Sequence, residues 1–307
     1  MKSQFTIVIP TFNGEETIGK LLEGISAFND NYSKETIIID STSTDNTLNI
    51  VNAFKDKLAP LKIVIIKKSE FDHGLTRNFG VQQSKGKYVC FFSQDAKPVS
   101  KKMLDYYWED FKNDKKVMAV YGKHISYSDT PVIQRIESDC FWEKLDPYLD
   151  ERGVLVKNLA HPFILFNEDS KYLWYELSDT SSCYSREFLL EYPFSKTKYG
   201  EDMLMGKLII DKGLYIVYDT RCSVYHSHSY SLRDYYKREK ESVGLVVNEM
   251  RLKKRINFLC KVEKIMQLKT SYFKKIYHLG ELLVFYFIKM LILFVLLTER
   301  SINNDSG

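Results

Sequence analysis

The first hundred residues alternate between short apolar segments and segments in which apolar residues have helical spacing. The apolar segments have strand length, are rich in β-branched or aromatic residues, and comprise residues 5–9, 36–40, 63–67 and 88–93. Between them, apolar side chains recur at intervals of three and four in residues 15–28, 47–58 and 75–83. This alternation predicts an α/β fold with a Rossmann-like, mixed and mostly parallel sheet covered by helices on both faces.

A polar, turn-forming loop follows each predicted strand. The loops begin at Pro10, Asp40, Glu70 and Gln94, and each contains oxygen or imidazole groups. Because ligands of open parallel sheets bind at the carboxyl ends of the strands, four such loops in series predict one polar site. No G-x-G-x-x-G or P-loop motif follows any strand, so phosphate binding would fall to a metal ion and basic side chains.

The second half of the chain is less regular. Residues 117–121 and 215–218 are predicted strands, and residues 201–212 form a predicted helix that ends at Gly213. Residues 139–178 are rich in aromatic residues without a period, and they give no assignment. Charged residues at 27% and hydrophobic residues at 44% exclude disordered, collagen-like and multi-span membrane proteins.

Basic residues are concentrated in one segment. The net charge is only +4, but residues 250–280 hold nine Lys or Arg and a single acid, Glu263. The rest of the chain is net acidic, which argues against nucleic-acid binding. The apolar run Leu282–Leu297 follows, interrupted only by Lys289. A helix over this run would be about 24 Å long, short of the ~30 Å hydrocarbon core, which disfavours a membrane span.

Two interpretations of this carboxy-terminal region remain open. The basic segment and the apolar helix suit an anionic cytoplasmic leaflet, with the basic side chains on the headgroups. A helix buried between subunits of a homo-oligomer would need no membrane. We favour association with the membrane.

Five cysteines are scattered along the chain at positions 90, 140, 183, 222 and 260. None forms a C-x-x-C pair, so neither a zinc knuckle nor a disulfide framework is indicated. The strand-like segment FTIVIP begins at Phe5, which leaves no room for a signal peptide. We therefore expect reduced thiols in a cytoplasmic protein.

Six segments together form a recognisable series. In chain order they are IPTFNGEETIGKLL (9–22), IIIDSTSTDNT (37–47), FDHGLTRNFG (71–80), YVCFFSQDAKP (88–98), YGEDMLMGKLIIDKG (199–213) and VYHSHSYS (224–231). The series resembles family 2 glycosyltransferases of the GT-A fold, and within them it is most similar to bacterial rhamnosyltransferase-like members. The first two segments are common to the superfamily. The narrower combination F-D-H-G-x-T-R-N with Q-D-A points to rhamnosyl transfer.

The resemblance implies that Asp40 accepts a hydrogen bond from the pyrimidine base of a nucleotide-sugar donor. Pro10, Thr11 and Asn13 would flank the same base. From the residues alone, Asp40 could equally form an Asx turn or a helix cap. Asp45 stands two residues before Thr47 and is better explained as a cap, so we leave it out of the site.

A metal site is predicted at the end of the fourth strand. A carboxylate at Asp95 is costly there unless it is paired with a cation. In the family this position holds Mg²⁺ or Mn²⁺ on the donor diphosphate; here the motif is Gln94-Asp95-Ala96, with one acid where many relatives have two or three. The resemblance adds a histidine, His226 in preference to His228, as a contact of the metal or the phosphates. Alternatively, Asp95 caps a turn and the histidines lie on the surface.

His73 and Arg77 lie one helical turn apart and are expected to share a face. An arginine near a helix N-terminus suits an anionic diphosphate, so both are predicted to bind the donor. The alternative for Arg77 is an ion pair with Asp72 or Glu70.

Asp202 follows Glu201 at the start of a predicted helix. An inverting transferase needs a base to take the proton of the acceptor hydroxyl, and the resemblance gives this role to the Asp of the E-D pair. The helix dipole also favours acids at this position, which explains Glu201 adequately and Asp202 only in part.

These interpretations predict a metal-assisted inverting transferase on the cytoplasmic face of the membrane. It would move L-rhamnose from dTDP-L-rhamnose to a glycan or lipid-linked acceptor in bacterial surface polysaccharide synthesis. Residues 1–110 would bind the donor, residues 111–231 the acceptor, and residues 232–307 would form a helical extension. The alternatives are a UDP-N-acetylhexosamine donor, or a non-catalytic membrane-bound partner protein that kept the fold.

Overall fold

The computed structural model describes residues 4–29, 31–58, 60–161, 168–197, 199–252 and 259–305. For residues 4, 168–170, 259 and 296–305 only the backbone is described. Residues 253–258 of the predicted basic segment lie outside these ranges. The chain divides into two compact units. The first unit comprises residues 1–125, 148–160 and 175–226, and the second comprises residues 126–147, 161–174 and 227–307.

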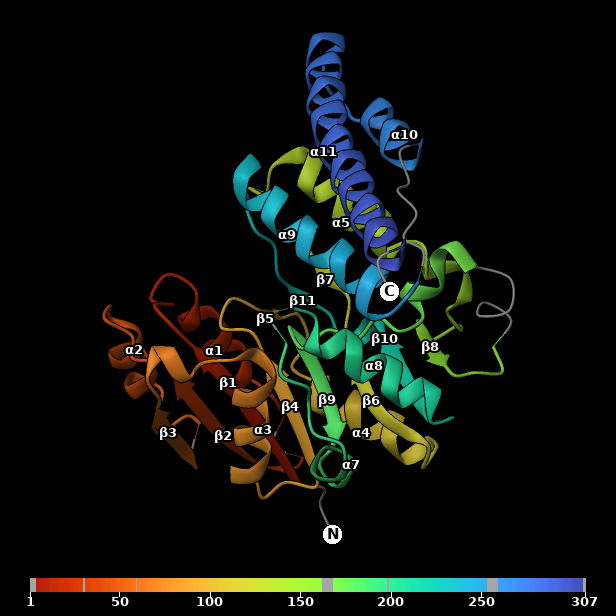
Figure 1. The fold of residues 1–307 in the computed structure, drawn as a ribbon. Coiled ribbons are helices and arrows are strands. Elements are labelled where there is room, and N and C mark those ends of the chain that lie inside the picture. Colours follow the sequence, from red (N-terminus) through yellow and green to blue (C-terminus); the bar gives the residue numbers. More distant parts are fainter. Residues whose placement is uncertain are drawn as a thin grey trace. The chain divides into compact units, whose positions relative to one another are not determined.

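The first unit is built on an eight-stranded sheet (Figure 1). Its amino-terminal half holds β1 (Gln4–Thr11), β2 (Ser33–Asp40), β3 (Leu61–Ile65) and β4 (Tyr88–Phe92), all parallel. Its other half holds β6 (Val117–Tyr121), β8 (Val154–Lys157), β9 (Ser181–Ser185) and β10 (Tyr215–Asp219). The order is β3-β2-β1-β4-β9-β6-β10-β8, and only β8 and β9 run antiparallel to their neighbours.

Helices cover both faces of this sheet because side chains of a strand alternate between its faces. From β1, Phe5, Ile7 and Ile9 enter the core beneath three helices, α1 (Ile18–Ser26), α2 (Thr47–Ala53) and α4 (Met103–Asn113). Val8 points to the other face, where α3 (His73–Gln83) crosses at Gly80. A Cβ at Gly80 would lie 2.5 Å from Cγ1 of Val8, so glycine permits this close approach. The predicted mixed, mostly parallel α/β fold is confirmed.

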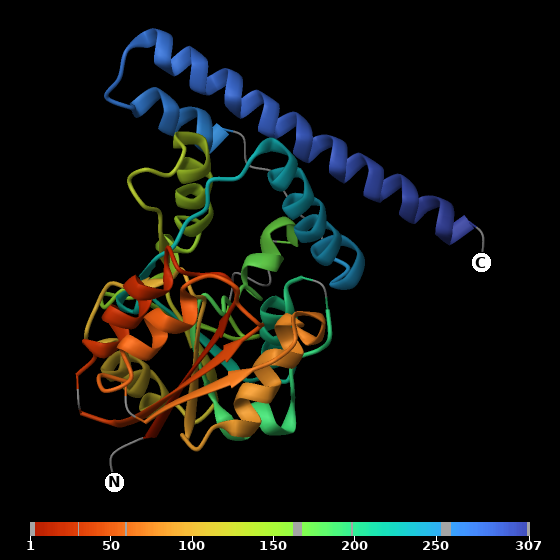
Figure 2. The same cartoon turned by 90° about the vertical axis from the view of Figure 1, so that its left-hand side faces the viewer.

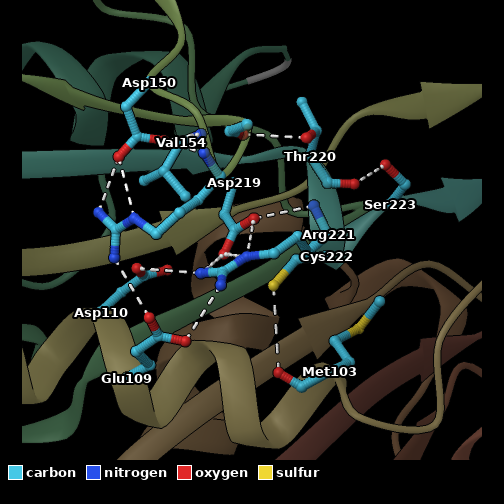
Figure 3. Close-up of polar contacts among 12 residues, drawn as sticks. Met103, Glu109, Asp110, Asp150, Val154, Asp219, Thr220, Arg221, Cys222 and Ser223 are labelled. Atoms are coloured by element: carbon cyan, nitrogen blue, oxygen red, sulfur yellow. Dashed lines mark hydrogen bonds and ion pairs between the residues drawn. The ribbon is translucent and has the colours of Figure 1, made fainter.

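A second, three-stranded sheet brings distant segments together. It consists of β5 (Lys97–Pro98), β11 (Val224–Tyr225) and β7 (His124–Ile125), in that order. Figure 3 shows the charged network that fixes the turn before β11 against α4. In it, Arg221 lies 2.8 Å from Asp219, 3.1 Å from Glu109 and 3.8 Å from Asp110.

The other short elements of the first unit include two helices and two helical turns. They are α7 (Arg186–Glu191), α8 (Glu201–Asp211), η1 (Lys68–Glu70) and η4 (Thr220–Cys222). Gly213 has φ of +73° just beyond α8, as its predicted place at the helix end requires.

The second unit is helical (Figure 2). Its helices are α5 (Val132–Trp142), α9 (Leu232–Gly244), α10 (Leu259–Gln267) and α11 (Tyr272–Asp305), with turns η2 (Asp146–Tyr148), η3 (Glu168–Leu173) and η5 (Leu245–Glu249). The core joins Ile136 of α5, Tyr235 of α9, Ile265 of α10 and Phe285 of α11.

The carboxy-terminal helix is longer than the apolar run suggested. A length of 16 residues was expected, but α11 has 34, because the helix begins ten residues earlier, in the basic segment, and ends eight residues later. Its stretch Tyr272–Val295 has the length and composition of a membrane span, by those two criteria alone. The argument that this helix is too short to span is therefore wrong.

Candidate active site

The loops after β1 and β2, at the carboxyl edge of the sheet, are joined by hydrogen bonds from backbone N–H groups to side chains. The N–H of Asn13 donates to Oγ of Ser43 at 2.9 Å, and the N–H of Thr44 donates to Oδ1 of Asn13 at 2.9 Å. The N–H of Gly14 donates to Oγ1 of Thr47 at 2.7 Å. Asn13 has a left-handed φ of +44°, a conformation that asparagine tolerates. The side chain of Asn13 therefore orders these loops, and its contact with a donor stays a prediction.

Asp40 is completely buried at the end of β2. Its carboxylate accepts hydrogen bonds from Oγ1 of Thr11 at 3.0 Å and from the N–H and Oγ of Ser43 at 2.8 and 2.6 Å. The structure thus brings Thr11 and Asp40 together beside Pro10 of β1, as predicted. Asp40 also forms the local turn considered as its alternative role, with Ser43 as the partner. Binding of a base by Asp40 stays a prediction.

Asp45 stabilises the start of α2. Its Oδ1 accepts from the N–H of Thr47 at 3.0 Å, and its Oδ2 accepts from the N–H of Glu15 at 3.0 Å. Asp45 thus accepts from the first N–H of α2, although the N-cap position itself belongs to Asn46, and its role as a cap stays a prediction.

Gln94 is paired with the backbone of Phe12. Its Oε1 accepts from the N–H of Phe12 at 2.9 Å, and its Nε2 donates to the carbonyl of Phe12 at 3.0 Å. Both functional groups of the amide are thus used to hold the loop after β1 against the loop after β4. Donor binding by Gln94 stays a prediction beside this structural role.

Asp95 and His226 lie together beside the small sheet. Nε2 of His226 is 3.4 Å from Oδ2 of Asp95, and their side chains are 10% and 24% exposed. The N–H of His226 donates to the carbonyl of Ile125 at 3.0 Å, and its ring meets the ring of His124 edge-on at 5.0 Å. Two ligand atoms bound at right angles to one Mg²⁺ or Mn²⁺ lie about 3 Å apart. This pair therefore fits adjacent positions around a divalent ion.

His228 belongs to the second unit, where its ring lies 5.1 Å from that of Tyr230. The preference for His226 over His228 stays a prediction.

Asp202 lies in the first turn of α8, after Gly200, which has φ of +73°. Its Oδ2 accepts from the N–H of Asp179 at 3.2 Å, and its Oδ1 accepts from the N–H of Met203 at 2.8 Å. Burial raises the pKa of Asp202 well above its usual value, and the carboxylates of Glu201, Asp179 and Glu176 raise it further. A raised pKa makes the ionised form of a carboxylate a stronger base.

Arg77 is 7% exposed and pairs with carboxylates from two other segments. Its Nε lies 2.9 Å from Oδ2 of Asp179, and its Nη1 contacts Oε1 of Glu201 and, at 3.1 Å, the carbonyl of His73. The ion-pair alternative named the wrong partners. Asp72 instead caps α3 through the N–H of Leu75 at 3.0 Å, and Glu70 pairs with Lys67 at 3.9 Å.

His73 and Arg77 lie one turn apart on α3, and their side chains differ in exposure. His73 is exposed and packs against Phe71 with 4.9 Å between ring centroids, whereas the guanidinium of Arg77 is buried. Donor binding by either residue stays a prediction, and in this structure Arg77 neutralises protein carboxylates.

Three residues of the site were not found from the sequence. His124, whose Nε2 lies 3.1 Å from Oγ of Ser178, follows a strand without any motif. Asp179 stands next to the segment that gave no assignment. Lys157 is completely buried, its Nζ bonded to the hydroxyl of Tyr121 at 2.9 Å and to the carbonyl of Glu176. Burial lowers the pKa of Lys157 to about 7.

The register of the sheet puts these loops on one edge. Thr11 is level with Asp40, and Phe92 is level with Ser181, so the loop containing Asp95 lies beside the segment containing Asp179. The N–H of Ser93 donates to the carbonyl of Thr180 at 3.2 Å, which ties these two segments directly. The described residues of the first unit therefore form one polar edge, with carboxylates from several strands.

Comparison with known proteins gives the class of the chain. Residues 6–165 match the family model described as glycosyl transferase family 2. The chain is similar to the O-antigen chain rhamnosyltransferase WbaN of Salmonella anatum, with 31% identity over 240 residues, covering 76% of this chain and 69% of that protein. It is also similar to the O-antigen chain rhamnosyltransferase RfbN of Salmonella typhimurium, with 25% identity over 250 residues, covering 76% and 70%.

Solved structures show the same fold. The mannosyltransferase PcManGT from Pyrobaculum calidifontis, in complex with GDP-Man and Mn²⁺, aligns with a TM-score of 0.61 at 14% identity, covering 97% of this chain and 87% of that one. TarS of S. aureus in complex with UDP-GlcNAc aligns with a TM-score of 0.55 at 20% identity, covering 94% and 73%. Fold and polar edge define a glycosyltransferase of the GT-A type. The chain belongs to glycosyl transferase family 2 and is similar in sequence to two O-antigen chain rhamnosyltransferases.

Proposed function

We propose that this enzyme is an inverting rhamnosyltransferase that uses dTDP-L-rhamnose. Its acceptor would be a glycan or a lipid-linked glycan in the synthesis of a bacterial surface polysaccharide. Two relatives named as O-antigen chain rhamnosyltransferases support this assignment, as does the segment FDHGLTRN. The observation that carries the proposal is the common edge of the sheet. Asp40 ends β2, Asp95 follows β4, and Asp179 precedes β9 at this edge. Asp179 in turn donates a hydrogen bond to Asp202.

A divalent cation, Mg²⁺ or Mn²⁺, would be held by Asp95 and His226. Their 3.4 Å separation and their oxygen and imidazole ligands support this assignment. When bound, such an ion supplies positive charge that offsets the charge of a departing diphosphate.

The protein's own groups would divide the remaining work. Asp40 and Thr11 would hold the base of the donor at the ends of β2 and β1. Asp202 would accept the proton of the acceptor hydroxyl as that oxygen attacks the anomeric carbon. Inversion needs a single displacement and no protein nucleophile. For such a displacement, the protein needs only to position the two substrates, offset the charge of the leaving group and provide one base.

The donor is tested by thermal unfolding of the purified enzyme with dTDP, UDP or GDP, each with and without Mn²⁺. A ligand that binds only the native state raises the unfolding temperature. We expect the largest increase with dTDP and Mn²⁺ together. An increase with UDP alone would contradict the rhamnosyl assignment.

A UDP-sugar donor, such as UDP-N-acetylhexosamine, is the second candidate. The protein named UDP-Glc:alpha-D-GlcNAc-diphosphoundecaprenol beta-1,3-glucosyltransferase WfaP of Escherichia coli supports it, at 28% identity over 182 residues. The same nucleotide panel distinguishes the two donors.

We further propose that the second unit associates with an anionic membrane at the cytoplasmic face. One face of α11 exposes a stripe of apolar side chains that includes Phe273, Tyr277, Phe287 and Phe294, 64% to 82% exposed. Lys289 faces the opposite way, 3.1 Å from Glu137 and 3.5 Å from Glu239. The exposed Lys269 and Lys274 near the start of α11 would meet anionic headgroups. A homo-oligomer formed through the same stripe is the alternative.

A further inference from the structure

Asp179 contacts both Asp202, the proposed base, and the buried Arg77 of the first unit. Asp179 is 1% exposed, and its Oδ1 accepts from Oγ of Ser182 at 2.7 Å and from the hydroxyl of Tyr184 at 2.6 Å. Its Oδ2 lies 2.9 Å from Nε of Arg77. Its backbone N–H donates to Oδ2 of Asp202 at 3.2 Å. One residue thus touches Asp202 through its backbone and Arg77 through its side chain.

Arg77 also contacts the helix that carries Asp202. Its Nη1 pairs with Glu201, the residue directly before Asp202 in the first turn of α8. Arg77 therefore joins α3, the segment before β9 and the start of α8. Glu201 precedes Asp202 in the chain and Asp179 lies beside it in space. The guanidinium of Arg77 neutralises both of these carboxylates.

We propose that Arg77 and Asp179 are positioning residues that set the orientation and the charge environment of Asp202. This inference rests on the proposed role of Asp202 as the base. Asp179 fixes one oxygen of Asp202 through its N–H, while the charges of Asp179 and Arg77 act on Asp202 in opposite directions. Neither side chain needs to touch the donor or the acceptor for this role.

The charges around Asp202 determine in which direction each substitution shifts its pKa. The groups that face it are Glu201 on its own helix, Asp179 and Glu176 in the segment before β9, and Arg77 on α3. Tyr184 of β9 lies close enough for Asp202 to raise its pKa. Removing the negative charge of Asp179 should make Asp202 release its proton at lower pH. Removing the positive charge of Arg77 should make it hold its proton to higher pH.

The test is a titration of protein labelled with ¹³Cγ-aspartate, in which the Asp202 signal is the one absent from Asp202→Asn. We expect the Asp202 midpoint to fall by about one unit in Asp179→Asn and to rise by about one unit in Arg77→Gln. Ser182→Ala, which removes one hydrogen bond to Asp179 but no charge, is the matched control and should leave the midpoint unchanged. Midpoints that do not move, or that move in the same direction, would contradict the proposal.

Arg77→Gln leaves the buried carboxylates of Asp179 and Glu201 without their cationic partner, so this variant is at risk of failing to fold. In that event Asp179→Asn decides alone, because it keeps the shape of the side chain and the backbone N–H. Arg77→Lys then serves as the second variant: it keeps the charge but not the two-pronged geometry, so the midpoint should be retained.

A kinetic measurement on the same variants separates this proposal from the proposed function. The rate of dTDP release from dTDP-L-rhamnose with Mn²⁺, with water as the acceptor, should depend on pH with a midpoint about one unit lower in Asp179→Asn than in the wild type, in parallel with the titration of Asp202. The dissociation constant for dTDP should stay unchanged. If Asp202→Asn keeps the full rate, the assignment of the base fails. If Asp202→Asn is inactive but Asp179→Asn has the wild-type midpoint, only the positioning role fails.

Discussion

Nε2 of His226 and Oδ2 of Asp95 lie 3.4 Å apart although the two residues are far apart in the chain. The three-stranded sheet explains this proximity. Its strand β5 follows Asp95 directly, and its central strand β11 ends just before His226. The turn that leads into β11 is held by Arg221, so the position of the histidine depends on the charged network around that arginine.

Replacing His226 with Asn should weaken the binding of the metal ion. The loss of one ligand is expected to raise the Mn²⁺ concentration needed for half of the dTDP-induced thermal stabilisation by at least about tenfold. The matched control is His278→Asn in α11, whose ring contacts Glu281 at 2.8 Å in the second unit. Equal Mn²⁺ requirements for the two variants would exclude His226 as a ligand.

Replacing Asp202 with Asn should abolish transfer while nucleotide binding persists. The variant keeps the size of the side chain but cannot accept a proton, and general bases contribute on the order of 10²- to 10⁴-fold to rate. Sugar transfer and dTDP binding are measured on the same protein. Transfer at the wild-type rate would show that another group is the base.

Asp110 should make the protein less stable as the pH rises. It is 3% exposed, and burial, with Asp219 close by, raises its pKa to about 8 from 3.8. The native state therefore holds this proton more strongly than the unfolded chain. The stabilisation is fully present below pH 4 and is lost progressively up to pH 8. Figure 3 shows Asp110 beside Arg221 in this network.

The Asp110→Asn variant should have an unfolding temperature that falls less between pH 5 and pH 8 than that of the wild type, because its neutral amide does not ionise. Thermal unfolding across this range measures the difference, with Asp56→Asn, at an exposed position, as the control. Parallel pH profiles for wild type and Asp110→Asn would refute the prediction.

The exposed face of α11 predicts binding to anionic vesicles. A Phe287→Glu/Phe294→Glu double variant places two charges in the stripe and should reduce co-flotation with phosphatidylglycerol vesicles by about tenfold or more. Leu190→Glu, which changes an exposed leucine of the first unit, is the control and should float like the wild type. Vesicle-independent dimerisation that the double variant abolishes would instead support the homo-oligomer.

Strands and helices were predicted best where the spacing of apolar residues and the type of side chain indicate the same element. Strands and helices of the first hundred residues were placed to within a few residues, since their buried segments are continuous and apolar. The strand β9 was missed because its sequence, Ser-Ser-Cys-Tyr-Ser, is polar; it is buried all the same, and its serines and tyrosine bond to Asp179 and Tyr107. β-Propensity alone cannot identify a strand whose polar side chains are buried and form hydrogen bonds with distant parts of the chain.

For the site, the sequence identified which loops meet but not which groups pair within them. Arg77 was expected to face an anionic ligand, yet it neutralises Asp179 and Glu201, which lie far away in the chain. Lys289 was an interruption of an apolar run, and in the structure it turns inward to Glu137. Such pairings depend on tertiary contacts between distant segments, which spacing along the chain does not encode.

The pairing of Gln94 with Phe12 limits how the motif Gln94-Asp95-Ala96 can change. An aspartate at position 94 would match the acid-rich motifs of many relatives, but it could accept the N–H of Phe12 without donating to its carbonyl. The first loop would lose one of its two ties, and a second negative charge would stand beside Asp95. A second acid introduced at position 94 would therefore remove a contact that holds the first loop beside Asp95.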